Sequence, residues 1–151
     1  MKQLIRSTVI VAGIAALSAA RPHAVPNPWT VVVANGPFAG TYNAKAAEVM
    51  CFHYKTQKML GASFKDFDAK GARALAEGGI KVDNPDAPGA KTGDLQVGFG
   101  NSDKLSIAYS VYNVPITVTP KGKGADLVGA GKTKDGVQIR ITANCAEIEQ
   151  L

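Results

Sequence analysis

The stretch Leu95–Val118, LQVGFGNSDKLSIAYSVYNVPITV, decides the fold, because apolar side chains occupy every second position on both sides of one polar turn. The turn is Gly100–Asp103, whose glycine, asparagine, serine and aspartate are typical of tight connections. Alternation with a period of two predicts half-buried β-strands, and two such runs around a short turn predict an antiparallel pair. The apolar positions are Leu95, Val97, Phe99, Leu105, Ile107, Tyr109 and Val111.

The alternation changes phase after Asn113, where the apolar positions move to Val114, Ile116 and Val118. Pro115 lies at the change. Because successive side chains of a strand point to opposite faces, a phase change requires an inserted residue or a break in the strand. We therefore expect a bulge or a break close to Asn113.

Similar patterns surround this stretch. Val137–Cys145 alternates in the same way, and Thr30–Ala34, Val49–Tyr54 and Leu60–Phe64 are short runs that favour strands. The Asp-Gly pair at 135–136 predicts a tight hairpin with a type I′ turn. Several short strands with turns about every 8–12 residues predict an all-β fold. We expect an antiparallel β-sandwich, because the phase change and the uneven strand lengths fit two sheets better than one closed barrel.

One segment differs from this pattern. Residues 68–77, DAKGARALAE, are rich in alanine and are followed by Gly78-Gly79. Alanine favours helices, and a glycine directly after the last turn is a common helix end. We therefore expect one short helix near residues 68–77 within the otherwise all-β fold.

The N-terminus predicts a secretory signal peptide. Lys2 and Arg6 precede a short uncharged run over residues 7–20 that ends in small side chains, and we expect cleavage after Ala20 or, alternatively, after Ala24. An uncleaved anchor or a buried helix is the alternative interpretation. A membrane-spanning helix needs about 20 apolar residues, however, which is more than this run supplies. We expect the mature protein to be secreted or periplasmic, with no transmembrane anchor.

The mature chain has the size of one domain. Removing residues 1–20 from the 151 leaves 131 residues, and the formal net charge falls from +5 to +3 because Lys2 and Arg6 are lost. Residues 21–29 contain three prolines and predict an extended leader, and residues 30–151 predict a single β-sandwich domain. So mild a positive charge does not indicate a nucleic-acid binder.

The chain contains two cysteines, Cys51 and Cys145. Outside the cytosol two such residues are expected to pair. The disulfide would enclose a loop of about 94 residues, for which loop-closure entropy gives a stabilisation of about 4–5 kcal/mol. A redox or metal-binding role is the alternative, but the sequence has no CxxC motif and no second ligand cluster.

Acidic and amide side chains between the predicted strands are candidate metal ligands. Calcium prefers oxygen ligands, and Asp83, Asn84, Asp86 and Asp94 offer several within a short segment. The alternative is that these residues are simply typical of loops, since their spacing matches no calcium-loop pattern. No cofactor is expected, because the sequence has no phosphate-cradling loop, zinc-binding helix or nucleophile elbow.

Four lysines are candidate anion-binding residues. Lys121, Lys123, Lys132 and Lys134 fall in two turns that flank one hairpin, so we expect them to gather at one end of the sheet. There they would attach the protein to an anionic surface. Protection of the sheet edges against aggregation is the favoured alternative, because no aromatic side chains interleave with these lysines to stack bases.

Other side chains were considered for ligand binding and catalysis. The set Tyr109, Tyr112, Phe99 and Met50 would line an apolar pocket between the sheets, although ordinary core packing is the favoured interpretation. His53 lies between two aromatic residues and is expected to be a half-buried strand residue rather than a general base.

The layout of the chain has three marks: an opening Gly40-Thr41-Tyr42, a cysteine shortly after it, and a terminal run Lys134–Cys145. This layout resembles the mycobacterial 19-kDa lipoprotein antigen family of small exported proteins. The resemblance implies a β-sandwich surface protein without an established enzymatic site. The acylated cysteine that this family carries at the signal junction is absent from the sequence, so a lipid anchor is not expected.

Together these features predict an exported, disulfide-linked β-sandwich that acts by binding or by its presence at the cell surface, without catalysis. Its partner would be an anionic surface or an apolar small molecule. The first alternative is a carrier that holds a small apolar or lipid ligand between the sheets. The second is a glycan-acting enzyme, which the dispersed acidic residues disfavour because such enzymes use paired carboxylates.

Overall fold

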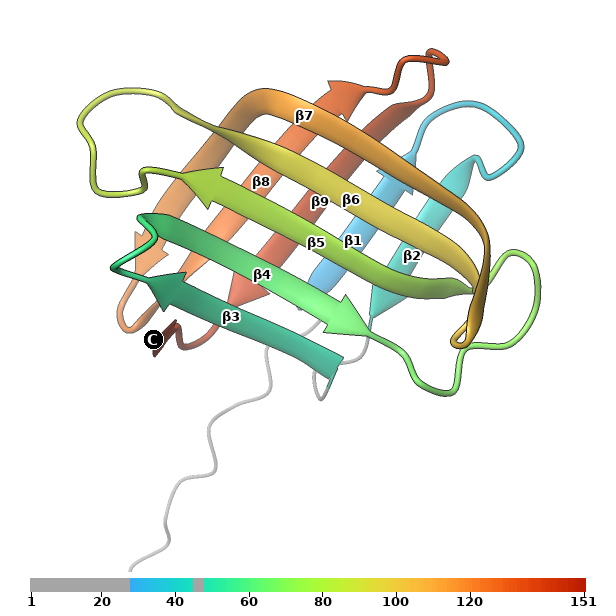
Figure 1. Ribbon diagram of the computed structural model, residues 1–151, viewed down its shortest axis with the longest axis horizontal. Helices are drawn as coiled ribbons and strands as arrows, with labels where there is room; N and C mark the ends of the chain where they lie inside the picture. The colour runs from blue at the N-terminus through green and yellow to red at the C-terminus, as the bar shows by residue number, and fades with distance from the viewer. Residues whose placement is uncertain (1–27, 45–47) are drawn as a thin grey trace, which may run out of the picture.

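The computed structural model describes residues 28–44 and 48–151, which form ten β-strands in a single sheet (Figure 1). The described residues contain no α-helix, and none of their segments is a helix long and apolar enough to cross a membrane. The predicted signal peptide, both cleavage sites and residues 21–27 of the leader lie outside the described residues. The strands are β1 (Trp29–Val33), β2 (Gly40–Ala44), β3 (Val49–Tyr54), β4 (Met59–Lys65), β5 (Leu75–Asp83), β6 (Lys91–Asn101), β7 (Lys104–Lys121), β8 (Gly124–Lys132), β9 (Gln138–Cys145) and β10 (Glu149–Gln150).

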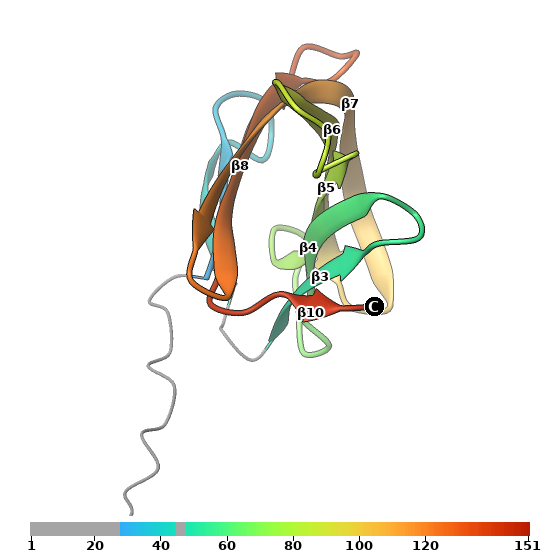
Figure 2. The same ribbon diagram turned by 90° about the vertical axis from the view of Figure 1, so that its left-hand side faces the viewer.

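The sheet is strongly curled into a half-barrel. Its strand order is β10-β3-β4-β5-β6-β7-β8-β9-β1-β2, and only the β10–β3 pair is parallel. Strands β3–β7 form one half, and β8, β9, β1 and β2 form the other (Figures 1 and 2). The long strand β7 belongs to both, because it pairs with β6 as far as Ile116 and with β8 from Ile116 onward. The all-β class is confirmed, but one continuous curled sheet is not clearly the predicted two-sheet sandwich.

The phase change in β7 is a β-bulge, as the sequence predicts. Val111 lies opposite Leu95 and Val114 lies opposite Gly93, so two residues of β7 face the single residue between them on β6. Asn113 in the bulge has a φ of 54°. The extra residue restores the inward direction of the apolar side chains, since Val111 and Val114 are both buried.

The predicted helix near residues 68–77 is wrong. Residues 66–74 form turns and bends, and Leu75–Asp83 is the interior strand β5. Alternate residues of β5 are buried, and the strand pairs with both β4 and β6. These pairings outweigh the helix propensity of alanine, and Gly71 with a φ of 103° interrupts any helical turn.

The loop over residues 66–74 is fixed to the connection between β1 and β2. The Arg73 guanidinium donates hydrogen bonds to the backbone carbonyls of Pro37 and Ala39. It also lies over the Phe38 ring, 5.4 Å from the ring centre. Residues far apart in the sequence therefore join the two halves of the curl at this end.

The tight hairpin between β8 and β9 is confirmed, but its turn type is not the predicted one. A type I′ turn has positive φ at both central residues. Here Gly136 has a φ of 84°, while Asp135 is not among the residues with positive φ. The Gly136 amide donates to the Thr133 carbonyl (3.0 Å), and the Thr133 amide donates to the Val137 carbonyl (2.9 Å). This is the pattern of a three-residue loop with a left-handed glycine.

Large side chains and the disulfide hold the two halves together. Trp29, the last residue of the predicted leader, begins β1, is fully buried and has its ring centre 5.3 Å from that of Phe64 on β4. The predicted disulfide between Cys51 and Cys145 is confirmed, with Cα atoms 5.9 Å apart. It links β3 to β9, which are not neighbours in the sheet, and so it fixes the curl.

Candidate functional site

The four candidate calcium ligands are divided between two places. Asp83 and Asp94 both form ion pairs with Lys81, while Asp86 lies in the following loop with its carboxylate 3.5 Å from Nε2 of His53. Asn84 adopts a φ of 47° at the start of that loop. In the described part of the chain, no group of three His, Cys, Asp or Glu side chains is placed to hold a metal ion. His53 itself is a half-buried strand residue, with its side chain 14% exposed.

The four candidate anion-binding lysines do not gather at one end of the sheet, so that expectation is wrong. Lys121 and Lys123 lie just before β8. Lys132 is the last residue of this strand, and Lys134 follows it. A nine-residue strand of about 3.3 Å per residue separates the two pairs by about 26 Å. Lys121 forms an ion pair with Asp126, and the Lys123 ammonium lies 4.0 Å from the Glu147 carboxylate.

The four residues expected to line a pocket between the sheets lie on different faces. Phe99 and Tyr109 are buried in the core, with ring centres 6.3 Å apart. Met50 and Tyr112 are 62% and 70% exposed. Only Phe99 and Tyr109 therefore pack in the core, and the four residues do not form the expected pocket.

A shallow trough crosses the outer face of β3–β7, the face turned toward the viewer in Figure 1. The strand register places Ser63, Gly79, Gln96 and Ser110 in one row from β4 to β7. All four are small or polar, and they form the floor. We call this floor, together with the side chains that border it, the outer trough.

Two adjoining hollows make up the outer trough. One has a volume of about 490 Å³ and extends to Met50 and Phe67, and the other has a volume of about 290 Å³ and extends to Phe52 and Tyr112. Both include the floor from β4 to β6. A Cβ atom at Gly79 would meet nothing within 4 Å, so the missing side chain of this glycine opens the middle of the trough.

Exposed hydrophobic side chains gather around the outer trough. Four large ones are exposed in the described residues, and three of them border it: Met50, Phe67 and Tyr112. Phe67 is the most exposed of the three, at 76%. Apolar side chains clustered beside a concave surface are typical of a site that contacts another molecule.

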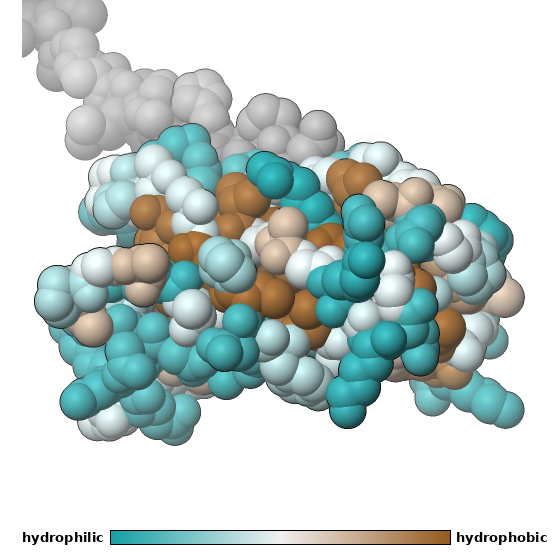
Figure 3. All heavy atoms as spheres, turned by 90° about the horizontal axis from the view of Figure 1, so that it is seen from above, coloured by the Kyte–Doolittle hydropathy of each residue, from teal (hydrophilic) through white to brown (hydrophobic). Residues whose placement is uncertain are grey.

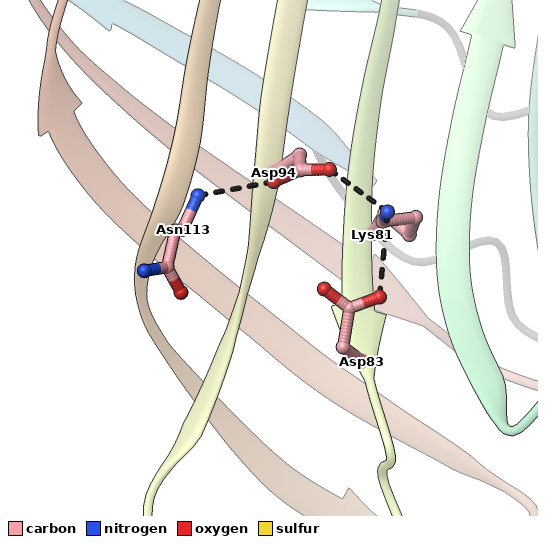
Figure 4. Close-up of polar contacts among 4 residues, drawn as sticks. All are labelled: Lys81, Asp83, Asp94 and Asn113. Atoms are coloured by element: carbon pink, nitrogen blue, oxygen red, sulfur yellow. Dashed lines mark hydrogen bonds and ion pairs between the residues drawn. The ribbon is translucent and has the colours of Figure 1, made fainter.

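Asp94 supports one wall of the outer trough and ties it to the bulge in β7. Its Oδ1 accepts a hydrogen bond from the Asn113 backbone amide (3.0 Å), and its Oδ2 lies 2.8 Å from Lys81 Nζ (Figure 4). Lys81 Nζ also lies 3.3 Å from Oδ1 of Asp83. The Lys81 hydrogen bond lowers the pKa of Asp94, and the same contact raises the pKa of Lys81.

In the described part of the chain, two polar atoms of the buried core have no hydrogen-bond partner, the Trp29 indole nitrogen and the Tyr109 hydroxyl. The Tyr109 hydroxyl is buried and has no hydrogen-bond partner among the described residues. Burial raises the pKa of Tyr109. Seen from above, hydrophobic side chains gather along the middle of the molecule between hydrophilic ones (Figure 3).

None of the four floor residues is a candidate from the sequence. Alternation shows that each points away from the apolar face of its strand. Which outward residues become neighbours depends on the strand register, and the register depends on turns and on the bulge at Asn113. The sequence does not mark Phe67 as a binding residue either, because single exposed apolar residues on loops are common.

Comparison of the chain with protein-family models, with curated proteins and with solved structures finds no match.

Proposed function

We propose that this chain is an exported protein that binds a ligand through the outer trough, without catalysing a reaction. The observation that carries the proposal is the gathering of three exposed hydrophobic side chains around a concave row of small and polar residues. Ligand sites combine apolar lining with a few polar groups that fix orientation, and the outer trough has both.

The disulfide supports the secreted or periplasmic location that the N-terminal sequence predicts. Bonds such as Cys51–Cys145 persist in oxidising compartments and are rare where thiols are kept reduced.

The electrostatics of the outer trough favour binding over catalysis. A carboxyl group that donates a proton near neutral pH needs a raised pKa. Lys81 and the Asn113 backbone amide instead lower the pKa of Asp94, so this carboxylate stays charged and bonded to both groups. Asp94 is therefore unsuited to be the general acid that a glycan-acting enzyme needs.

A carrier of a small apolar ligand between the halves of the curl is the second candidate. The unpaired Tyr109 hydroxyl favours it, because a buried polar group gains from a ligand that pairs with it. The rings of Phe38 and Phe99 pack beside Tyr109, each with its centre 6.3 Å away. Because these rings already pack around Tyr109, we place the ligand on the outer face instead.

Chemical-shift mapping tests the proposal without knowledge of the natural ligand. The isotope-labelled mature protein is titrated with a library of small polar and apolar fragments. We expect the perturbed backbone amides to cluster at Ser63, Gly79, Gln96 and Ser110. Perturbations confined to the surroundings of Tyr109 would replace this proposal with the carrier, and perturbations at neither place would overturn both.

A further inference from the structure

From the shape, chemistry and charge of the outer trough, we infer that its ligand is a neutral glycan chain. This inference rests on the proposed binding function and names the class of ligand. A glycan presents apolar ring faces together with hydroxyl groups at the ring edges. The outer trough offers a partner for each of these features.

The shape of the outer trough suits an extended chain. The trough runs across the strands from Met50 on β3, which pairs with Ser63, to Ser110 on β7. Four strand spacings of about 4.8 Å give a length of about 19 Å. The trough is shallow and open along this length, so a linear oligosaccharide fits it better than a compact small molecule.

The floor provides hydrogen-bonding groups that the other described residues leave free. Ser63 and Ser110 carry hydroxyls, and Gln96 carries an amide that both donates and accepts. None of these side chains makes a hydrogen bond to another residue within 28–44 or 48–151. A purely apolar ligand would remove them from water without replacing those hydrogen bonds, which is unfavourable.

Aromatic rings border the floor at both ends of one wall. Phe52 lies opposite Gly61, and a Cβ atom at Gly61 would come within 3.0 Å of the Phe52 ring. The ring therefore lies across the glycine. Tyr112 stands exposed at the other end, beyond Asp94. Apolar sugar faces pack on such rings, while the hydroxyl groups reach the floor.

Each lysine at the outer trough is engaged by carboxylates. Lys81 is paired with Asp83 and Asp94, and the Lys65 ammonium lies 3.9 Å from the Glu77 carboxylate. Glu48 lines the trough beside Lys65 and Glu77, so carboxylates outnumber the lysines and neither lysine is free to attract a polyanion. These carboxylates disfavour an anionic chain, and the hydroxyl and amide groups of the floor suit a neutral one.

An array of neutral and anionic oligosaccharides, followed by titration calorimetry with the strongest neutral ligand, tests the inference. The array carries β-glucan, chitin, mannan and galactan fragments beside sulfated and uronic-acid chains. We expect a neutral chain to bind, with an affinity that added sodium chloride does not change. Failure of every neutral chain to bind, or binding of anionic chains alone, would overturn the inference.

Two variants and a matched control place the bound glycan. Gly79→Val puts a side chain in the open middle of the floor, where a Cβ atom meets nothing within 4 Å, and Tyr112→Ala removes an exposed ring. Each should weaken binding by about tenfold or more. Ala130→Val adds bulk at an exposed position of β8, outside the outer trough, and should leave the affinity unchanged. Equal binding by Gly79→Val and wild type would overturn the inference. Fragment mapping to the floor without any neutral-glycan binding would reject the glycan alone and leave the binding function standing.

Discussion

Gly78 and Gly79 are neighbours on β5 with opposite surroundings. A Cβ atom at Gly78 would lie 2.9 Å from the rings of both Trp29 and Phe64, whereas a Cβ atom at Gly79 would meet nothing. Gly78 therefore allows the two rings to meet across the core, and Gly79 opens the outer trough. One residue serves the packing of the interior and the next shapes the outer surface.

Substituting these glycines by alanine should separate the two roles. We expect Gly78→Ala to lower the free energy of unfolding by about 1–3 kcal/mol, because the added methyl group overpacks the Trp29–Phe64 contact. Gly79→Ala should be neutral or raise it by about 0.5–1 kcal/mol, since alanine loses less backbone entropy on folding. Chemical denaturation measures both. Equal stabilities of the two variants would show that the core tolerates a side chain at Gly78.

Asp94 links stability to pH. Its pKa is lowered in the folded protein by Lys81, so its contribution is complete above the ordinary pKa of 3.8 and is lost as the pH falls through the folded value. Asp94→Asn should lower the free energy of unfolding by about 0.5–1 kcal/mol at neutral pH. The difference from wild type should shrink in acid, below a pH of about 4. Denaturation at several pH values checks this, and a difference independent of pH would mean that the ion pair does not stabilise the fold.

At the scale of single elements, the bulge in β7 connects the sequence pattern with the bend of the sheet. The phase change after Asn113 is visible in the sequence, and the structure shows two residues opposite one at that point. Asn113 is one of the few non-glycine residues with positive φ among the described residues. Asparagine tolerates this conformation better than most residues. The Asn113 backbone amide also donates a hydrogen bond to the Asp94 carboxylate.

Replacing Asn113 tests whether the bulge depends on this conformation. Asn113→Val should lower the free energy of unfolding by about 1–3 kcal/mol, because a β-branched residue is strained at a φ of 54°. Asn113→Gly should keep the stability of wild type within about 0.5 kcal/mol. Thermal or chemical denaturation compares the two. A harmless Asn113→Val would mean that β7 can bend by another route.

The predictions from the sequence are correct for strands with a local pattern. They are wrong where the structure depends on pairing between distant segments. Strands such as β6 and β9 follow from alternation, but β5 does not, because the alanine-rich run before Gly78 favours a helix until β4 and β6 pair with it. The lysine prediction fails for a related reason. Turns that are close in sequence lie at opposite ends of the same strand, and only the length of β8 reveals this.

At the scale of the whole molecule, the disulfide joins two strands that are not neighbours in the sheet. Cys51 and Cys145 lie on β3 and β9, near opposite edges of the ten-stranded sheet, and their bond holds the curl closed. The sequence predicts this pairing from compartment alone. The curl itself, with one continuous sheet through β7, depends on the register of all the strands and could not be predicted from local patterns.

Removing the disulfide should destabilise the whole fold. Cys51→Ser combined with Cys145→Ser should lower the free energy of unfolding by about 2–5 kcal/mol, because the unfolded chain regains the freedom of a loop spanning 94 residues. Chemical denaturation of the double variant and the wild type measures the difference. In addition, thiol titration of the unfolded, unreduced wild type should find no free thiol. An unchanged stability would mean that core packing alone closes the curl.

Binding at the outer trough is the claim on which the functional account depends. Its most direct test is the affinity of the fragment that binds most strongly, measured by titration of wild type, Gly79→Val and Ala130→Val under identical conditions. The account predicts an affinity about tenfold weaker or more for Gly79→Val, with no fall in melting temperature, and no change of affinity for Ala130→Val. An equal affinity of all three proteins would contradict it.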